Sequence, residues 1–324
     1  MRAVQISQLD GPSSARVVDL DEPTGDGAVV IEVHAAGVAF PDVLQSRGLY
    51  QYKPELPFVP GGEAAGVVRS APPGAHVRAG DRVAALTMLN GAMAQVIALP
   101  AEQVFKLPDT VSFEAGAGLL FNDLTVLFAL TTRGGLSEGK TVLVHGAAGG
   151  IGTSTLRLAG ALGASRVIAV VSTPAKAEVA RAAGATDTVL ADGFRDAVSE
   201  LTGEKGVDLV LDPVGGDRFT DSLRSLAPGG RLLVVGFTGG EIPTVKVNRL
   251  LLNNVDVVGV GWGAWVMSHP GELEQQWSVL EPLLASGAVA PPHPEVFDLE
   301  QAADALAALE NRTAAGKVVL RMRG

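Results

Sequence analysis

Short apolar runs, broken repeatedly by Gly and Pro, characterise residues 1 to about 110. Runs rich in Val, Ile and Ala that are bounded by turn residues are typical of β-strands. The predicted strands in this part are 28–38, 64–71 and 81–86. Their spacing predicts a small all-β barrel or sandwich. The pattern ends at Pro108-Asp109, after which Ser112 and Glu114 indicate the start of a helix.

From about residue 120 to 265 the pattern changes to apolar runs that alternate with helix-like segments. The predicted strands here are 141–146, 166–172, 187–191, 206–216, 229–237 and 255–262, with helices at 151–163 and 174–184. Continuously apolar strands indicate burial on both faces, as in a parallel sheet. The alternation therefore predicts a doubly wound α/β domain. Two further helices, 271–287 and 299–312, precede a last strand, 316–322, which could join either domain.

Composition narrows the classes of function. The chain has 324 residues, which favours two domains. Its net charge of −10 argues against nucleic acid as a partner. The absence of Cys excludes disulfides, thiolate zinc sites and Cys nucleophiles, and the five His residues lack metal-ligand spacing. Because neither an apolar run of about 18 residues nor a signal-peptide layout is visible, we expect a cytoplasmic protein.

The strongest motif is VLVHGAAGGIG at residues 142–152, between a predicted strand and a predicted helix. It matches the G-x-G-x-x-G dinucleotide fingerprint with Ala at its first position. Gly149 would let the backbone approach a pyrophosphate, and Gly152 would let the helix pack against the strand. The helix N-terminus would supply free N–H groups to the anion. The alternative is a tight turn without a ligand. The residues expected to bind cofactor here are Gly146, Ala148, Gly149, Gly150 and Ile151.

The choice between NAD and NADP depends on the end of the second predicted strand. An NAD site usually has Asp or Glu there to hold the ribose hydroxyls. Here Val171 is followed by Ser172 and Thr173, and Lys176 comes on the first turn of the next helix. Hydroxyls with a nearby cation suit a 2′-phosphate, so the sequence favours NADP(H). The alternative for Lys176 is an ordinary solvated helix residue.

Several motifs in order resemble the medium-chain dehydrogenase/reductase superfamily, in its zinc-free, zeta-crystallin-like quinone oxidoreductase branch. They are AGVAFPDVLQSRGLY (36–50), VPGGEAAGVV (59–68), GDRVAAL (80–86), the loop at 142–152, DPVGG (212–216), GGRLLVVGF (229–237) and AAGKVVLRM (314–322). The resemblance implies three segments: a GroES-like β-barrel domain at 1–117, a Rossmann domain at 118–264 and a returning segment at 265–324. It also implies a homodimer through the apolar edge strand at 255–263.

The resemblance also bears on zinc. Zinc-dependent alcohol dehydrogenases of this superfamily place Cys and His ligands where this chain has Ala39 and Gly62, and only Glu63 remains. Catalytic zinc normally needs three protein ligands. We therefore expect no metal, and hydride transfer from NADPH to a quinone or an α,β-unsaturated carbonyl. Two alternatives stay open: an enoyl-thioester reductase, and a non-catalytic, crystallin-like cofactor-binding protein.

The resemblance implies further site residues. Those expected in the substrate cleft are Phe40, Asp42 and Tyr50. The alternative for Asp42 is a structural hydrogen-bonding role. Tyr50 could donate a proton or a hydrogen bond to an enolate oxygen, or serve only for packing. Those expected around the nicotinamide and its riboside are Asn122, Thr125, Gly236, Phe237, Trp262 and Gly263. Lys317 is expected to contact the cofactor from the returning segment. The alternatives for the later residues are a strand-end aromatic, a turn and a solvated cation.

Overall fold

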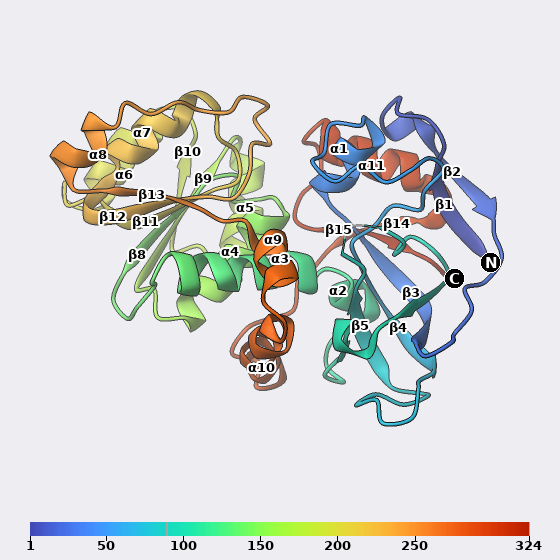
Figure 1. Cartoon of the computed structure of the whole chain (residues 1–324). Coiled ribbons are helices and arrows are strands. Elements are labelled where there is room, and N and C mark those ends of the chain that lie inside the picture. Colours follow the sequence, from blue (N-terminus) through green and yellow to red (C-terminus); the bar gives the residue numbers. More distant parts are fainter. Residues whose placement is uncertain (89, 324) are drawn as a thin grey trace. The chain divides into compact units, whose positions relative to one another are not determined.

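The computed structural model describes residues 1–88 and 90–323 and divides into two compact units (Figure 1). The first unit comprises Met1–Leu124 together with Pro270–Gly324, and the second comprises Thr125–His269. The two boundaries were expected after residues 117 and 264, and both lie a few residues further along the chain. The first boundary falls inside a helix, α3 (Leu120–Leu127), which no sequence pattern marked as shared.

The first unit is built on a sheet that combines both ends of the chain. Its strands are β1 (Arg2–Ile6), β2 (Ala15–Asp19), β3 (Val29–Val38), β4 (Glu63–Ser70), β5 (Arg82–Leu86), β6 (Val96–Leu99), β7 (Val104–Lys106), β14 (Glu295–Asp298) and β15 (Val318–Arg321). The described residues form a seven-stranded sheet in the order β14-β15-β3-β4-β5-β7, with β6 paired to β3, while β1 and β2 pair separately. The last strand, β15, runs antiparallel to β3, so it joins the first unit.

The first unit also contains several helices. They are α1 (Phe40–Ser46), α2 (Phe113–Gly116), the start of α3, α10 (Glu272–Ala285) and α11 (Ala302–Glu310), with single-turn helices η1 (Pro12–Ser14), η2 (Ala101–Gln103) and η5 (Leu299–Gln301). The expected helix start at Ser112 is confirmed, because the Ser112 side chain accepts a hydrogen bond from the Ala115 N–H as the N-cap of α2.

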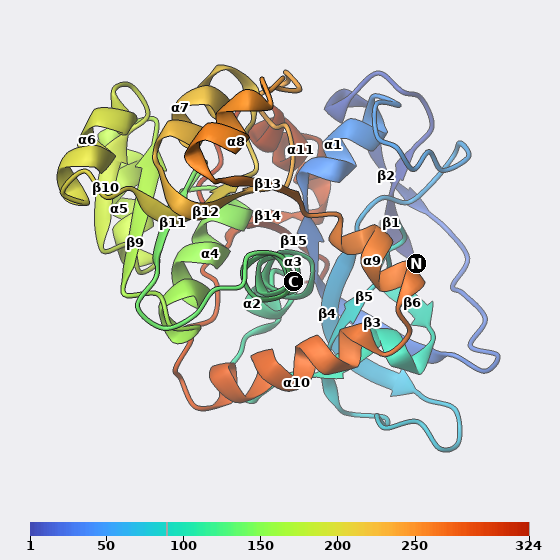
Figure 2. The same cartoon turned by 60° about the vertical axis from the view of Figure 1, so that its left-hand side comes forward.

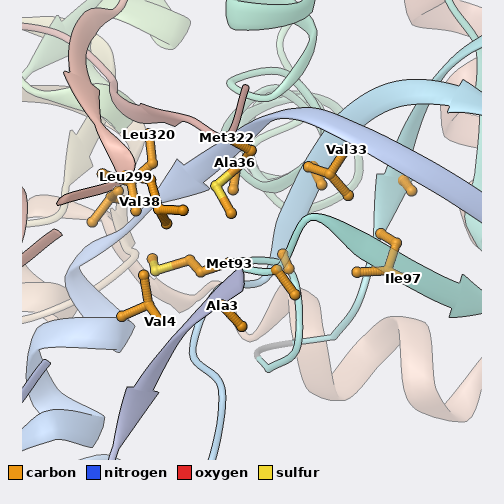
Figure 3. Packing of buried hydrophobic residues seen from close by; sticks show 14 of the residues in the cluster. Ala3, Val4, Val33, Ala36, Val38, Met93, Ile97, Leu299, Leu320 and Met322 are labelled. Atoms are coloured by element: carbon orange, nitrogen blue, oxygen red, sulfur yellow. The ribbon is translucent and has the colours of Figure 1, made fainter. Parts of the chain in front are cut away.

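The core of the first unit gathers side chains that are far apart in the sequence. Val33, Ala36 and Val38 of β3 pack in one cluster with Leu320 and Met322, and Figure 3 shows these side chains converging with others from the N-terminal strands. Full burial of such a side chain contributes about 1.5–3 kcal/mol. The C-terminal strand is therefore part of the hydrophobic core of this unit.

The second unit confirms the predicted doubly wound α/β domain. Its strands are β8 (Thr141–Val144), β9 (Arg166–Val171), β10 (Asp187–Leu190), β11 (Val207–Asp212), β12 (Leu226–Val234) and β13 (Asp256–Gly259). The described residues form a parallel sheet in the order β10-β9-β8-β11-β12-β13. The expectation of one strand over 255–262 is wrong at its end, because β13 stops at Gly259 and Trp262 begins a helix.

Helices cover both faces of this parallel sheet. They are α4 (Gly150–Ala161), α5 (Pro174–Ala182), α6 (Phe194–Leu201), α7 (Phe219–Arg224), α8 (Asn248–Asn253) and α9 (Trp262–Ser268), with a π-helical turn η3 (Phe128–Arg133) and a single turn η4 (Gly216–Arg218). Helices α4 and α5 contact each other, as do α6 and α7, and Figures 1 and 2 show these pairs on opposite faces of the sheet. Among the described residues, none of the helices has the length and apolarity to cross a bilayer.

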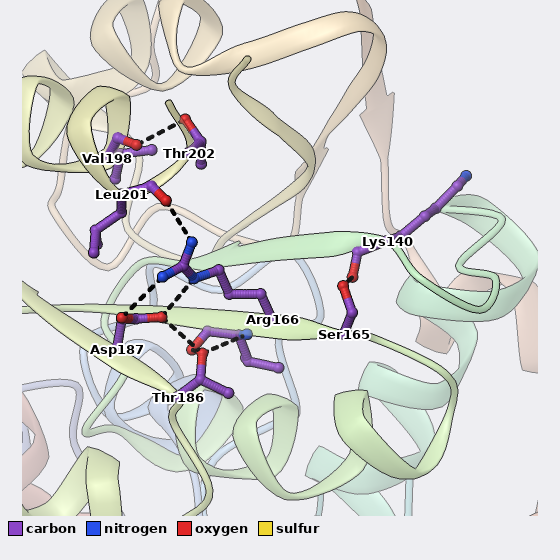
Figure 4. Close-up of polar contacts among 9 residues, drawn as sticks. Lys140, Ser165, Arg166, Thr186, Asp187, Val198, Leu201 and Thr202 are labelled. Atoms are coloured by element: carbon purple, nitrogen blue, oxygen red, sulfur yellow. Dashed lines mark hydrogen bonds and ion pairs between the residues drawn. The ribbon is translucent and has the colours of Figure 1, made fainter. Parts of the chain in front are cut away.

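Arg166 ties together the amino-terminal edge of the parallel sheet. Its guanidinium donates from Nε to an Asp187 carboxylate oxygen at 2.7 Å, and it also donates to the carbonyl of Leu201 at the end of α6 (Figure 4). Thr186 adds a bond from its hydroxyl to the same carboxylate, at 3.0 Å. The starts of β9 and β10 and the end of α6 are therefore fixed at the edge opposite the glycine-rich loop.

Candidate functional site

The strand order of the second unit reverses between β8 and β11. Chain order runs from β8 towards β10 on one side and from β11 towards β13 on the other. In open α/β sheets, ligands bind at such a switch point, beyond the carboxyl ends of the strands. The loops that follow β8 and β11 meet there, because a Cβ placed on Gly146 would lie 3.1 Å from Val214 Cγ2. This edge is therefore the candidate ligand site of the second unit.

The glycine-rich loop has the close contacts that the fingerprint predicts. A Cβ on Gly152 would lie 2.3 Å from the Gly146 carbonyl oxygen and 2.5 Å from Ala147 Cα. Only Gly fits at this position, since real Cβ atoms do not approach so closely. Gly146 itself has a φ of 57°, in the left-handed region that Gly adopts readily. The loop thus passes directly from β8 into α4, and the backbone at Gly152 packs against the backbone of Gly146 and Ala147.

Gly149 is the N-cap residue of α4, and its N–H donates to the Gly146 carbonyl at 2.9 Å. A Cβ on Gly149 would meet only that same carbonyl within 4 Å, so the other side of this residue is open. The N–H groups of the first helical turn have no partner within a helix, and the helix dipole adds positive potential there. Gly149, Gly150 and Ile151 therefore fit an incoming pyrophosphate.

The loop after β9 has hydroxyls and a cation, and its first residues contain no carboxylate. Ser172 and Thr173 are both exposed. Thr173 is the N-cap of α5, and its hydroxyl oxygen accepts from the Lys176 N–H at 3.3 Å. The hydroxyl proton of Thr173 remains able to donate. The Lys176 side chain is half-buried on the first turn of α5. This arrangement fits a phosphate better than it fits two ribose hydroxyls.

The loops after β11 and β12 are joined to each other. The Asp212 carboxylate accepts from the N–H groups of Val214 and Gly215, at 2.8 Å and 3.0 Å, which fixes the turn after β11. The Thr238 N–H donates to the Pro213 carbonyl at 3.0 Å. The expected residues Gly236 and Phe237 therefore stand beside this turn, at the same edge of the sheet as the glycine-rich loop.

Phe237 and Trp262 differ in exposure. Phe237 is 38% exposed, and its ring lies against Gly215, where a Cβ would come within 2.9 Å of Phe237 Cδ1. Trp262 is buried at the start of α9, and Gly263 beside it has open space around its Cα. The Val260 N–H donates to the Val234 carbonyl, so this segment begins next to the end of β12.

Asp42, in the first unit, lies on the first turn of α1. Its carboxylate is buried and accepts from the Ala39 N–H at 2.7 Å and from the Gly61 N–H at 3.0 Å. It therefore caps α1 and joins that helix to the turn before β4. Burial raises the pKa of Asp42 to about 6 against the opposing effect of these two hydrogen bonds.

Tyr50 follows α1 in a loop and is half-buried. Burial raises the pKa of its phenol, and the charge of Asp42 adds to the rise. The hydroxyl therefore keeps its proton at neutral pH and is available as a donor. Phe40 begins α1 and is partly exposed.

Lys317 has a partner that the sequence analysis did not foresee. Its Nζ lies 2.6 Å from Glu63 Oε1, and both side chains are almost fully buried, at 3% and 2% exposure. The other oxygen of Glu63 accepts from the Phe121 N–H at 2.9 Å. Burial raises the pKa of Glu63, and the charge of Lys317 opposes the rise. Lys317 is thus paired inside the first unit, and its expected contact with a cofactor stays a prediction.

Two glycines make room for this ion pair. A Cβ on Gly37 would lie 2.6 Å from Glu63 Cγ, and a Cβ on Gly118 would lie 2.9 Å from Lys317 Cγ. The packing role of Gly37 has no local signal in the sequence, because its neighbour Glu63 lies on another strand. Asn122 and Thr125, the expected nicotinamide neighbours, are buried one turn apart on α3.

Val214 and Asp212 were missed as site-forming residues. Their signal was the DPVGG run at the end of a buried strand, which was used for the resemblance and not assigned a role. Across residues 1–88 and 90–323, no three His, Asp or Glu side chains are grouped so that they could hold a metal ion.

Comparison with known proteins agrees with this architecture. The profile of the alcohol dehydrogenase GroES-like domain matches residues 25–109, and that of the zinc-binding dehydrogenase family matches residues 150–281. The mouse quinone oxidoreductase-like protein 2 is 35% identical over 99% of this chain and 92% of its own length. The Thermus thermophilus quinone oxidoreductase, solved alone and with NADPH, aligns with a TM-score of 0.85 at 34% identity, covering 99% of this chain and 100% of that one. The Escherichia coli quinone oxidoreductase with NADPH gives 0.87 at 29% identity, with the same coverage.

Proposed function

Because this chain belongs to the quinone oxidoreductase branch of the medium-chain dehydrogenase/reductase superfamily, we propose that it reduces a quinone or an α,β-unsaturated carbonyl with NADPH. The observation that carries the proposal is the glycine-rich turn at the switch point of the parallel sheet, open on the side of Gly149. Two solved relatives with this fold hold NADPH.

The residues at this edge of the sheet fit the parts of NADPH. The N–H groups of Gly149, Gly150 and Ile151 would bind the pyrophosphate, in a loop shaped by Gly146 and Ala148. Ser172, Thr173 and Lys176 would bind the 2′-phosphate. Gly236 and Phe237 would contact the nicotinamide riboside, and Trp262 and Gly263 its carboxamide. When bound, NADPH supplies the hydride that the substrate receives.

The first unit would supply the surroundings of the substrate. Tyr50 keeps its proton at neutral pH, so its hydroxyl can donate a hydrogen bond to an oxygen on which negative charge develops. Both oxygens of Asp42 are bound by backbone N–H groups, so we assign it the positioning of α1 and of Phe40 at the start of that helix.

We propose that no zinc takes part. The positions of the family's Cys and His ligands hold Ala39 and Gly62, and the chain has no Cys. The remaining acidic residue, Glu63, binds Lys317 and the Phe121 N–H, which use one carboxylate oxygen each. A catalytic zinc would therefore lack its three protein ligands.

We also propose a homodimer through β13, which is the last strand of the parallel sheet. An apolar strand with an unpaired edge is a site for pairing with another chain. Val257 and Val258 are half-exposed, and Leu251 and Leu252 on the preceding helix are 77% and 74% exposed. A mass near 33.2 kDa in sedimentation at working concentration would contradict the dimer.

The test of function is oxidation of NADPH, followed by absorbance, with benzoquinone, phenanthrenequinone, cyclohexenone and crotonyl-CoA, each repeated with NADH. We expect turnover with a quinone or with the enone, and a preference for NADPH. Turnover with crotonyl-CoA alone would instead support an enoyl-thioester reductase. Absence of turnover with every acceptor, together with tight NADPH binding in calorimetry, would refute the proposed reaction and favour a binding role.

A further inference from the structure

Gln45 is a buried amide for which the described chain supplies no hydrogen-bond partner. It lies on α1, is 2% exposed, and neither its Nε2 nor its Oε1 has a partner. Buried side-chain amides nearly always have partners, in protein or in ordered water. An exception such as this one indicates that something outside the polypeptide completes the hydrogen bonds of the amide.

The amide lines a small cavity. The cavity has a volume of about 20 Å³, and its polar lining comes from Gln45, Tyr50, Tyr52 and Lys53. One water molecule needs about 10–15 Å³ and two to four polar partners. The cavity therefore has room for one water beside the unpartnered carboxamide of Gln45, and it is too small for a quinone ring.

Local backbone structure brings Tyr50 to this cavity. The Gly48 N–H donates to the Gln45 carbonyl at 2.9 Å, and the Leu49 N–H donates to the Leu44 carbonyl at 2.8 Å. These bonds turn the chain back over the end of α1, so that the loop with Tyr50 follows directly. Tyr50 and Gln45 therefore line the same cavity.

We infer that Gln45 is a positioning residue: its carboxamide holds one buried water, and this water bonds to the Tyr50 hydroxyl and fixes its orientation. The inference rests on the proposed function, in which the Tyr50 hydroxyl donates a hydrogen bond to the substrate. Gln45 itself touches neither substrate nor cofactor. Its effect on catalysis passes entirely through Tyr50.

The first arm of the test is a crystal structure of the full chain without ligand. We expect density for one water within about 3.2 Å of both the Gln45 carboxamide and the Tyr50 hydroxyl. A cavity without water, or a water bound to Gln45 but not to Tyr50, would overturn the inference. This arm does not depend on finding a substrate.

The second arm is kinetic, with the best acceptor of the panel. Gln45→Met keeps the size of the side chain and removes its hydrogen bonds. It should lower kcat/KM about fivefold, as expected for one lost hydrogen bond. Tyr50→Phe should lower it at least as much, and the double variant should lose no more than Tyr50→Phe alone, because the two residues act as a unit.

Gln276→Met is the matched control, since Gln276 is another buried glutamine of the first unit and bonds to Glu272 on its own helix. Its kcat/KM should stay at the wild-type value. Losses that multiply in the double variant, or an equal loss in Gln276→Met, would overturn the inference. If the wild-type chain turns over none of the acceptors, the proposed function fails, and the crystallographic arm alone decides about the water.

Discussion

Replacement of Lys317 by Met should lower the stability of the first unit far more than a surface substitution would. The change removes the cation that lies 2.6 Å from the Glu63 carboxylate, in a place where both side chains are nearly inaccessible to water. Breaking a buried pair by removing one partner costs about 3–5 kcal/mol, because the remaining charge is buried without compensation. With a urea m-value of about 2 kcal/mol/M, the midpoint of unfolding should fall by about 2 M.

The double variant Glu63→Gln with Lys317→Met separates this explanation from general packing damage. Neutral side chains of similar volume can replace a buried ion pair at little net cost. The carboxamide oxygen introduced by Glu63→Gln could still accept the hydrogen bond that the Phe121 N–H now donates to the carboxylate. We therefore expect the double variant to recover to within about 1 kcal/mol of the wild type.

The single variant should also gain a pH dependence. Burial already raises the pKa of Glu63, and loss of Lys317 removes the main opposing effect. A carboxyl whose pKa is raised on folding loses stability as pH increases through its folded-state value. The penalty in Lys317→Met should therefore be smaller in mildly acidic buffer, where Glu63 is protonated, than at neutral pH.

Fluorescence of Trp277 can report this unfolding, because its ring packs against Phe105 in the first unit, at 5.4 Å between centroids. All compared variants would carry Phe at the other two Trp positions, which belong to the second unit. A loss below about 1 kcal/mol in Lys317→Met would refute the reasoning. So would a double variant no more stable than the single one. Weaker NADPH binding by the folded double variant would support the predicted contact of Lys317 with the cofactor.

Three further predictions concern the second unit. Gly152→Ala should lower the free energy of unfolding of the second unit by about 1–3 kcal/mol, because the new Cβ would clash with the Gly146 carbonyl. It should also weaken NADPH binding in calorimetry, and an unchanged affinity would contradict this prediction. Lys176→Glu should weaken NADPH binding about tenfold or more and leave NADH binding nearly unchanged; an equal loss for both would remove Lys176 from the 2′-phosphate site. Burial lowers the pKa of His145 to about 4, so the stability that its neutral form contributes is fully present above a pH of about 6.5. The free energy of unfolding should fall as the pH drops towards 4. In urea titrations, His145→Gln should lose less stability in acid than the wild type.

The fold and the phosphate loop could be predicted from the sequence because their determinants are local. A buried strand, a run of Gly and a helix start follow one another within residues 141–152, and close packing at Gly152 leaves no other residue type there. The same holds for the helix start at Ser112, whose hydroxyl stands three residues before its partner N–H. Such features depend on residues a few positions apart, so the local sequence contains all the information that predicts them.

The errors and omissions have non-local causes. The apolar run 255–262 gives no sign of where pairing with β12 ends, so the strand was predicted too long. The pairing of Lys317 with Glu63 has no local signal, because it forms only when β15 pairs with β3. Gln45 fits an ordinary helix position, and only the three-dimensional arrangement shows that its amide has no partner. Each case depends on contacts between segments far apart in the sequence.

The pairing of β15 with β3 has a consequence for the order in which the protein can mature during synthesis. The second unit is one uninterrupted stretch, Thr125–His269, so all of its strands have been synthesised before residues 270–323 are made. The first unit begins the chain, but the edge of β3 and the cluster around Val38 stay uncovered until the segment with Leu320 emerges. Domains generally fold as units during translation. In this protein the middle of the chain can therefore fold first. The amino-terminal strands must wait until β15 has been synthesised, with an apolar edge that a chaperone could protect.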